Sequence, residues 1–280
     1  MFSFVKFILL SLSCAVAKPA PLFTSHLPVV VMHGLDSSSL NMEPFSAWIA
    51  AEFNTKVFNL EIGNGEKTSL YMPMTDQLGE LCATIYATEE LRDGFNFIGM
   101  SQGGLLARGY VERCNLSPVV NLITLVSPHG GEYLKTINTD MYSSFAQAHL
   151  SLAGYWRNPR EMPAYLTKCS YLPLLNNEKE NKASQSQKKQ MQSLANFVMV
   201  WSPADAVLSP PESGKFSFFD ENLNVVALED TAIYAADLLG LKYLNDQDRL
   251  HTYQTNCSHV DHRNPICYSQ LYAILKNFLD

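Results

Sequence analysis

A serine between two glycines follows an apolar run in the first half of the chain. Residues 99–103 read GMSQG, which has the spacing G-x-S-x-G, and the run FNFIGM before Ser101 is typical of a buried strand. On a sharp turn between a strand and a helix, side chains two residues before and after the serine would collide, which explains both glycines. The pattern predicts that Ser101 is a nucleophile for acyl transfer.

A nucleophilic serine needs a base to take its proton and an acid to orient that base. After a G-x-S-x-G serine, the acid and the histidine follow in that order along the chain. Asp205 ends the apolar stretch FVMVWSPAD, and we predict that it is the acid. His259 lies in the loop after the last predicted strand, and we predict that it is the base, with His262 as the alternative. The alternatives to the acid lie in turn-like stretches: Asp220, Asp230 and Asp246.

Attack by a serine creates an oxyanion, which two backbone N–H groups must stabilise. One comes from the residue after the nucleophile, Gln102, and the other from the loop after the first strand. That loop reads HGLDSS, residues 33–38. We predict that Leu35 is the second donor, with Asp36 as the alternative.

Apolar segments rich in Val, Ile and Leu alternate with segments of helical spacing. The predicted strands lie within residues 27–34, 55–63, 94–101, 118–128, 196–205 and 249–259. The predicted helices lie within residues 75–91, 103–114 and 268–279. Because the apolar runs lack polar alternation, we predict an α/β fold with a mostly parallel central sheet and helices on both faces. Ser101 and His33 then lie at the carboxyl ends of strands, where ligands bind in such sheets.

The alternation stops between about residues 130 and 192, where aromatic and leucine-rich helical pieces replace the strands. We predict a helical cap inserted into a single domain that spans residues 18–280. Residues 1–17 combine one lysine, a short apolar stretch and the small-residue site AVA, which predicts a cleaved signal peptide. Since the apolar stretch is shorter than the roughly 20 residues that span a bilayer, we predict no stable membrane anchor.

Charge and composition exclude several classes of partner. The formal net charge of −7 argues against nucleic acid, because no basic stripe offsets it. His259 and His262 have an i, i+3 spacing, but no third ligand or H-E-x-x-H motif accompanies them. We therefore predict neither a metal nor another cofactor. In the secretory pathway, sequons at Asn115 and Asn256 are candidate sites for glycans.

The sequence segments around these residues resemble those of the palmitoyl-protein thioesterases, a branch of the α/β hydrolases. The likeness runs from about residue 29 to 279 and is carried by VVMHGLDSSS, FIGMSQGGLLAR, NLITLVSPHGG, YWRNP, LLNNE and FVMVWSPADAV. In this family the nucleophile, acid and base fall on Ser101, Asp205 and His259. The family's oxyanion donors fall on Leu35 and Gln102.

The resemblance also implies a lysosomal, glycosylated enzyme that removes long-chain acyl groups from cysteine thioesters. Its substrates would be S-palmitoylated proteins or peptides, or acyl-CoA, since SHVDHRN is nearer the branch known for acyl-CoA-type substrates. Two disulfides are implied, Cys82 with Cys114 and Cys257 with Cys267. Six residues of the predicted cap are candidates for lining an acyl groove: Tyr142, Phe145, Leu150, Leu152, Tyr155 and Trp156. The same triad would also serve a lipase or carboxylesterase, and a catalytically inactive binding protein is the other alternative.

Overall fold

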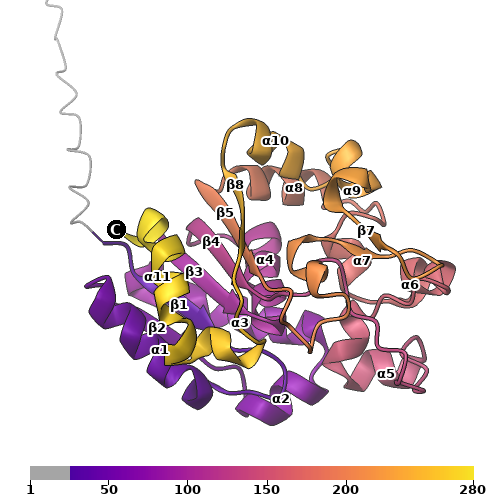
Figure 1. The fold of residues 1–280 in the computed structure, drawn as a ribbon, viewed down its shortest axis with the longest axis horizontal. Helices are drawn as coiled ribbons and strands as arrows, with labels where there is room; N and C mark the ends of the chain where they lie inside the picture. The colour runs from indigo at the N-terminus through magenta and orange to yellow at the C-terminus, as the bar shows by residue number, and fades with distance from the viewer. Residues whose placement is uncertain (1–25) are drawn as a thin grey trace, which may run out of the picture.

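Six strands form one parallel sheet at the centre of the molecule (Figure 1). The computed structural model describes residues 26–280, so the predicted signal peptide at residues 1–17 lies outside the described part. The strands run in the order β2-β1-β3-β4-β5-β8. Their bounds are β1 Val29–Met32, β2 Val57–Leu60, β3 Phe95–Met100, β4 Val119–Leu125, β5 Asn196–Trp201 and β8 Leu250–Gln254. The six predicted strands and the parallel sheet are therefore confirmed.

Helices cover both faces of the sheet, which explains the continuous apolar runs. Side chains alternate between the two faces along each strand, so Val30 packs on one face while Val29 and Val31 pack on the other. The face of Val29 is covered by α1 (Ser39–Glu52) and α11 (Pro265–Leu279). The opposite face is covered by α3 (Met74–Ala87) and α4 (Gln102–Arg113). The three helices predicted from periodicity correspond to α3, α4 and α11.

Two long excursions leave the sheet, before and after β5. The first contains four short helices: α5 (Ser144–His149), α6 (Met162–Lys168), α7 (Leu172–Leu175) and α8 (Ser184–Gln192). The second contains a small antiparallel pair, β6 (Phe218–Phe219) and β7 (Val225–Val226), with α9 (Ala232–Ala235) and α10 (Leu241–Asp246). Periodicity did not predict this second set, because its elements are too short to show a period. Figure 1 shows α5, α6, α7 and β7 gathered on one side of the sheet.

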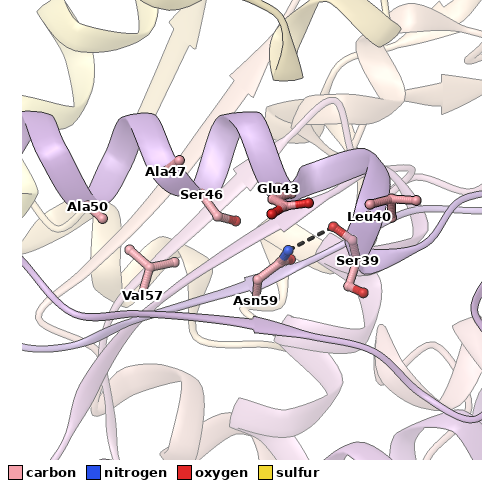
Figure 2. A pocket seen from close by; sticks show the side chains of 8 residues that line it. All are labelled: Ser39, Leu40, Glu43, Ser46, Ala47, Ala50, Val57 and Asn59. Carbon is pink, nitrogen blue, oxygen red and sulfur yellow. Dashed lines mark hydrogen bonds between the residues drawn. The ribbon is translucent and has the colours of Figure 1, made fainter.

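A shallow groove lies at the outer edge of the sheet, between α1 and β2. Figure 2 shows Asn59 of β2 turned toward the start of α1, where its amide donates to the Ser39 carbonyl at 2.7 Å. Ala47, Ala50 and Val57 line the rest of the groove. Glu43 is the one titratable residue among the residues that line this groove, and neither Ser101 nor His259 is among them.

A buried ion pair joins the helix that follows Ser101 to the first excursion. Arg108 and Glu112 lie one turn apart on α4, 2.9 Å from each other, and neither side chain reaches solvent. The same guanidinium donates to Asn176 Oδ1 at 2.7 Å. Burial outweighs the attraction of Arg108 and raises the pKa of Glu112 to about 7.

We expect the contribution of Glu112 to the stability of the protein to fall as the pH rises from about 4.5 to about 7. The folded state binds a proton on Glu112 in this window while the unfolded carboxyl releases it, so this contribution to the free energy of unfolding decreases by about 3 kcal/mol. Urea unfolding of the wild type and Glu112→Gln at pH 4.5 and 7 checks this. The difference in unfolding free energy between the wild type and Glu112→Gln must shift in favour of the variant as the pH rises from 4.5 to 7. The exposed variant Glu80→Gln must show the same pH dependence as the wild type. If the unfolding free energies of Glu112→Gln and the wild type change equally with pH, the prediction is wrong.

Candidate active site

Ser101 lies on a strained turn between β3 and α4. Its backbone has φ 54° and ψ −126°, a combination that non-glycine residues rarely adopt. A Cβ on Gly99 would lie 2.5 Å from the Gly103 carbonyl oxygen, and a Cβ on Gly103 would overlap the carbonyl of His33. Both glycines are therefore required by close backbone approach, as the G-x-S-x-G spacing predicted.

Asp205 and His259 form a buried pair, although 54 residues separate them in the chain. His259 Nδ1 lies 2.7 Å from Asp205 Oδ2, and the two residues are 7% and 4% exposed. The other carboxylate oxygen of Asp205 accepts from the amides of Val207 and Leu208 at 2.8 and 3.0 Å. Burial opposes ionisation, but His259 and these two amides outweigh it and lower the pKa of Asp205. The lowered pKa favours the ionised carboxylate of Asp205, which is hydrogen-bonded to the imidazole.

Ser101 and His259 line the same cavity, which has a volume of about 330 Å³. The Asp205–His259 pair stands at its wall, so the structure brings all three predicted residues to one place. Apolar side chains make up much of the remaining lining: Met100, Pro128, Leu134, Leu152, Val207, Leu208 and Val260. Asp36, Glu132, Tyr155 and Arg263 are the other titratable groups of the lining.

The loop after β1 approaches Ser101 closely. A Cβ on Gly34 would lie 2.8 Å from Ser101 Cβ, so only glycine allows the approach. Leu35 follows in the cavity wall. Gln102 is the first residue of α4, where an amide has no acceptor within its own helix. The Gln102 side chain is held by Tyr155, whose hydroxyl donates to Oε1 at 3.0 Å.

The alternative acids and the alternative base have other partners. Both ring nitrogens of His262 are engaged, by the Thr255 hydroxyl at 2.8 Å and by the Ser258 carbonyl at 2.9 Å. Asp220 accepts from Asn222 and Asn224 in the turn between β6 and β7, and Asp246 pairs with Lys242 on α10. Asp230 is exposed at the end of a short 3₁₀ turn. None of these four residues lines the cavity of Ser101.

Two of the six candidate groove residues reach the cavity. Leu152 and Tyr155 line it, whereas Phe145 is 67% exposed and Tyr142 is buried among other residues. Sequence periodicity could not distinguish the candidates that line the cavity from those that do not, because all six lie in short helices or turns. Glu132 was not identified from the sequence, since a single carboxylate after a strand carries no motif.

Within residues 26–280, no helix is long and apolar enough to cross a membrane. In the same part of the chain, no three His, Cys, Asp or Glu side chains gather closely enough to hold a metal ion. The two predicted disulfides are present, Cys82–Cys114 and Cys257–Cys267. Cys169 is free and buried.

Comparison with known proteins identifies the family. The family model for palmitoyl protein thioesterase matches residues 28–259. The chain belongs to this family. Palmitoyl-protein thioesterase 3 of Dictyostelium discoideum is 36% identical, over 91% of this chain and 92% of its own length. The lysosomal thioesterase PPT2 homolog of Drosophila melanogaster is 32% identical, over 81% of this chain and 83% of its own length.

Solved structures confirm the α/β-hydrolase fold. Paleococcus ferrophilus monoacylglycerol lipase superposes with a TM-score of 0.52 at 14% identity, and covers 90% of this chain and 93% of its own. Aspergillus fumigatus lipase B superposes with a TM-score of 0.54 at 10% identity, over 91% of this chain and 53% of its own. At these identities the likeness shows the fold of this chain and nothing about its substrate.

The Cys257–Cys267 disulfide closes the loop that carries His259, which predicts an effect on activity as well as on stability. Replacing both cysteines by serine should cost about 3 kcal/mol of unfolding free energy, the loop-closure term for so short a loop. Thioester hydrolysis should also fall at a temperature where the variant is folded, because the imidazole is less well held.

The matched control is the double serine variant at Cys82 and Cys114, whose disulfide joins α3 to the end of α4. It closes a longer loop, so its loss should cost about 4 kcal/mol. Its activity per folded molecule should stay near that of the wild type. Equal losses of activity in the two double variants would contradict a local role of the Cys257–Cys267 bond.

Proposed function

We propose that this chain hydrolyses long-chain acyl thioesters through an acyl-serine intermediate. Ser101 is the nucleophile, His259 the base and Asp205 the residue that orients it. One observation carries the proposal: the Asp205–His259 pair, with 2.7 Å between Oδ2 and Nδ1, stands at the same apolar cavity as Ser101 on its strained turn. Membership of the palmitoyl protein thioesterase family supports the thioester as the bond that is cleaved.

The position of the Asp205 carboxylate dictates the direction of proton transfer. It accepts the Nδ1 proton of His259, which leaves Nε2 as the base. Nε2 takes the proton of Ser101 as Oγ attacks the thioester carbonyl, and the same proton leaves with the thiol when the carbon–sulfur bond breaks. Water then attacks the acyl-serine with the same assistance, which releases the fatty acid and restores the Ser101 hydroxyl.

The Leu35 and Gln102 amides would stabilise the negative oxygen formed in both steps. Gln102 follows the nucleophile, and Leu35 is carried toward it by the close contact of Gly34 with Ser101. A thiol has a pKa near 8.5, so its sulfur bears negative charge readily and the carbon–sulfur bond breaks with little demand on proton donation by His259. The carbonyl attack and the hydrolysis of the acyl-serine therefore carry most of the barrier.

The apolar lining suits a long acyl chain. Each methylene that it buries contributes about 0.8 kcal/mol, so a fatty chain supplies much of its own affinity. At about 330 Å³ the cavity lies near the lower end of the range for ligand pockets, about 300–1,000 Å³. We propose that the helices of residues 130–192 act as the cap that provides Leu134, Leu152 and Tyr155. The acyl carrier is an S-palmitoylated protein or peptide, or acyl-CoA.

We also propose delivery through the secretory pathway to the lysosome, after removal of residues 1–17. The relatives from Drosophila melanogaster and Homo sapiens are named lysosomal thioesterases, at 32% and 30% identity. Two disulfides fit an oxidising route of synthesis.

Brief exposure of the enzyme to a palmitoylated peptide, followed by mass spectrometry, should trap palmitate on Ser101. Ser101→Ala should take up no label, either from this substrate or from a fluorophosphonate probe. A palmitoyl thioester should be cleaved faster than the p-nitrophenyl ester of palmitate or a glyceride. A strong preference for the oxygen esters would identify a lipase or carboxylesterase instead, and an unreactive Ser101 would identify a binding protein.

Asp205→Asn should lower kcat by about 10⁴-fold at pH 7, since an amide fixes the wrong imidazole tautomer. The asparagine oxygen can still accept from Val207 and Leu208, so the thermal midpoint should change far less than the rate. Asp220→Asn is the control, because that carboxylate bonds only within its own turn. A loss of less than tenfold in Asp205→Asn would exclude Asp205 as the orienting acid.

A further inference from the structure

Glu132 lies in the wall of the catalytic cavity and has no part in the mechanism above. It follows β4, is 4% exposed, and shares the cavity with Ser101, Tyr155 and Leu208. Nearly all of the surrounding lining is apolar or uncharged. An ionised carboxyl group in such a wall costs free energy, because a buried charge without a partner loses its hydration.

The backbone around Glu132 holds the side chain in place. Its amide donates to the Tyr155 carbonyl at 3.0 Å, and its carbonyl accepts from the Arg157 amide at 2.9 Å. Oε1 of the carboxyl accepts from the Ser209 amide at 2.9 Å. No side chain in residues 26–280 donates to the second oxygen, Oε2. The Tyr133 amide also favours the ionised carboxyl, and Glu132 is part of the cavity lining.

No salt bridge joins Glu132 to a cation within residues 26–280. The guanidinium of Arg157 is paired with Glu178 at 2.8 Å, so it serves another carboxylate. Burial raises the pKa of Glu132 well above its usual 4.5, and the negative charge of Asp205 adds to this, while the Ser209 and Tyr133 amides act in the opposite direction. The other titratable groups of the cavity are Asp36, Tyr155, His259 and Arg263. Arg263 donates to Ser37 in the loop after β1.

We propose that Glu132 decides when the cavity accepts a long acyl chain: as a neutral acid it forms part of the apolar wall, and as a carboxylate it excludes the chain. The proposal rests on the function proposed above and names a specificity-determining residue of the same site. A fatty chain that covers an ionised carboxylate strips its water without offering a hydrogen bond. A short acyl group leaves that water in place, so its binding is insensitive to this charge.

The protonation state of Glu132 sets how the KM for a palmitoyl thioester depends on pH. At acid pH the carboxyl holds its proton and the KM for a palmitoyl thioester is low. Above the pKa of Glu132, the chain binds only the protonated fraction, so KM rises by up to about tenfold per pH unit. Glu132→Gln keeps an acceptor for the Ser209 amide and stays neutral at every pH.

The test measures kcat and KM from pH 5 to 8.5 for a palmitoyl and a butanoyl thioester. With the wild type, KM for the palmitoyl substrate should rise with pH while KM for the butanoyl substrate stays level. Glu132→Gln should keep the palmitoyl KM low throughout. Glu80→Gln, an exposed change of equal charge, should follow the wild type in both. A palmitoyl KM that rises equally in Glu132→Gln, or that is level in the wild type, overturns the proposal.

A binding measurement separates this inference from the proposed function. Ser101→Ala and the double variant Ser101→Ala/Glu132→Gln are titrated with a palmitoyl thioester at pH 5 and 8.5, after thermal unfolding has shown both to be folded. The single variant should bind more weakly at pH 8.5 and the double variant equally at both values. If the wild type hydrolyses no thioester, the proposed function fails, and this titration still decides whether Glu132 controls chain binding. Equal pH dependence in the two variants overturns the inference.

Discussion

The hydrogen bond between Asp205 and His259 is the contact on which the arrangement of the site depends. Its two residues follow β5 and β8, which are neighbours in the sheet, so the pair is assembled by strand pairing between segments far apart in the chain. The Val207 and Leu208 amides hold the carboxylate, and the Cys257–Cys267 disulfide closes the loop of the imidazole. Loss of either support would leave the base free to turn away from Ser101.

Three buried carboxyl groups show how surroundings set protonation. Asp205 receives two backbone amides and an imidazole, which keep it ionised despite its burial. Glu112 has the guanidinium of Arg108 beside it, yet complete burial raises its pKa to about 7. Burial also raises the pKa of Glu132 well above its usual value, and the charge of Asp205 adds to this, although the Ser209 and Tyr133 amides oppose it. Burial therefore raises the pKa of a carboxyl group unless hydrogen bonds and nearby partners outweigh it, and among these three groups they do so at Asp205.

The two excursions from the sheet build the binding cavity between them. Leu134, Leu152 and Tyr155 come from the excursion before β5, whereas Val207 and Leu208 come from the one after it. Glu132 connects the two, because its carboxyl accepts from Ser209 while its main chain pairs with Tyr155 and Arg157. Tyr155 extends this connection to Gln102 at the start of α4. The acyl cavity and the catalytic turn are thus tied by hydrogen bonds as well as by apolar packing.

The sequence by itself determined the sheet and the turn that carries Ser101, since both depend on local patterns. Continuous apolar runs rich in Val and Ile favour strands covered on both faces, and G-x-S-x-G meets the steric needs of the Ser101 turn without help from distant residues. The sequence favoured His259 over His262 but left His262 open, because both histidines lie in one loop; the packing shows that Thr255 and Ser258 engage His262. The tertiary structure alone placed Glu132 and selected Leu152 and Tyr155 for the cavity. Whether a side chain faces a ligand is decided by segments that are remote in the chain, and short helices carry no periodicity that records it.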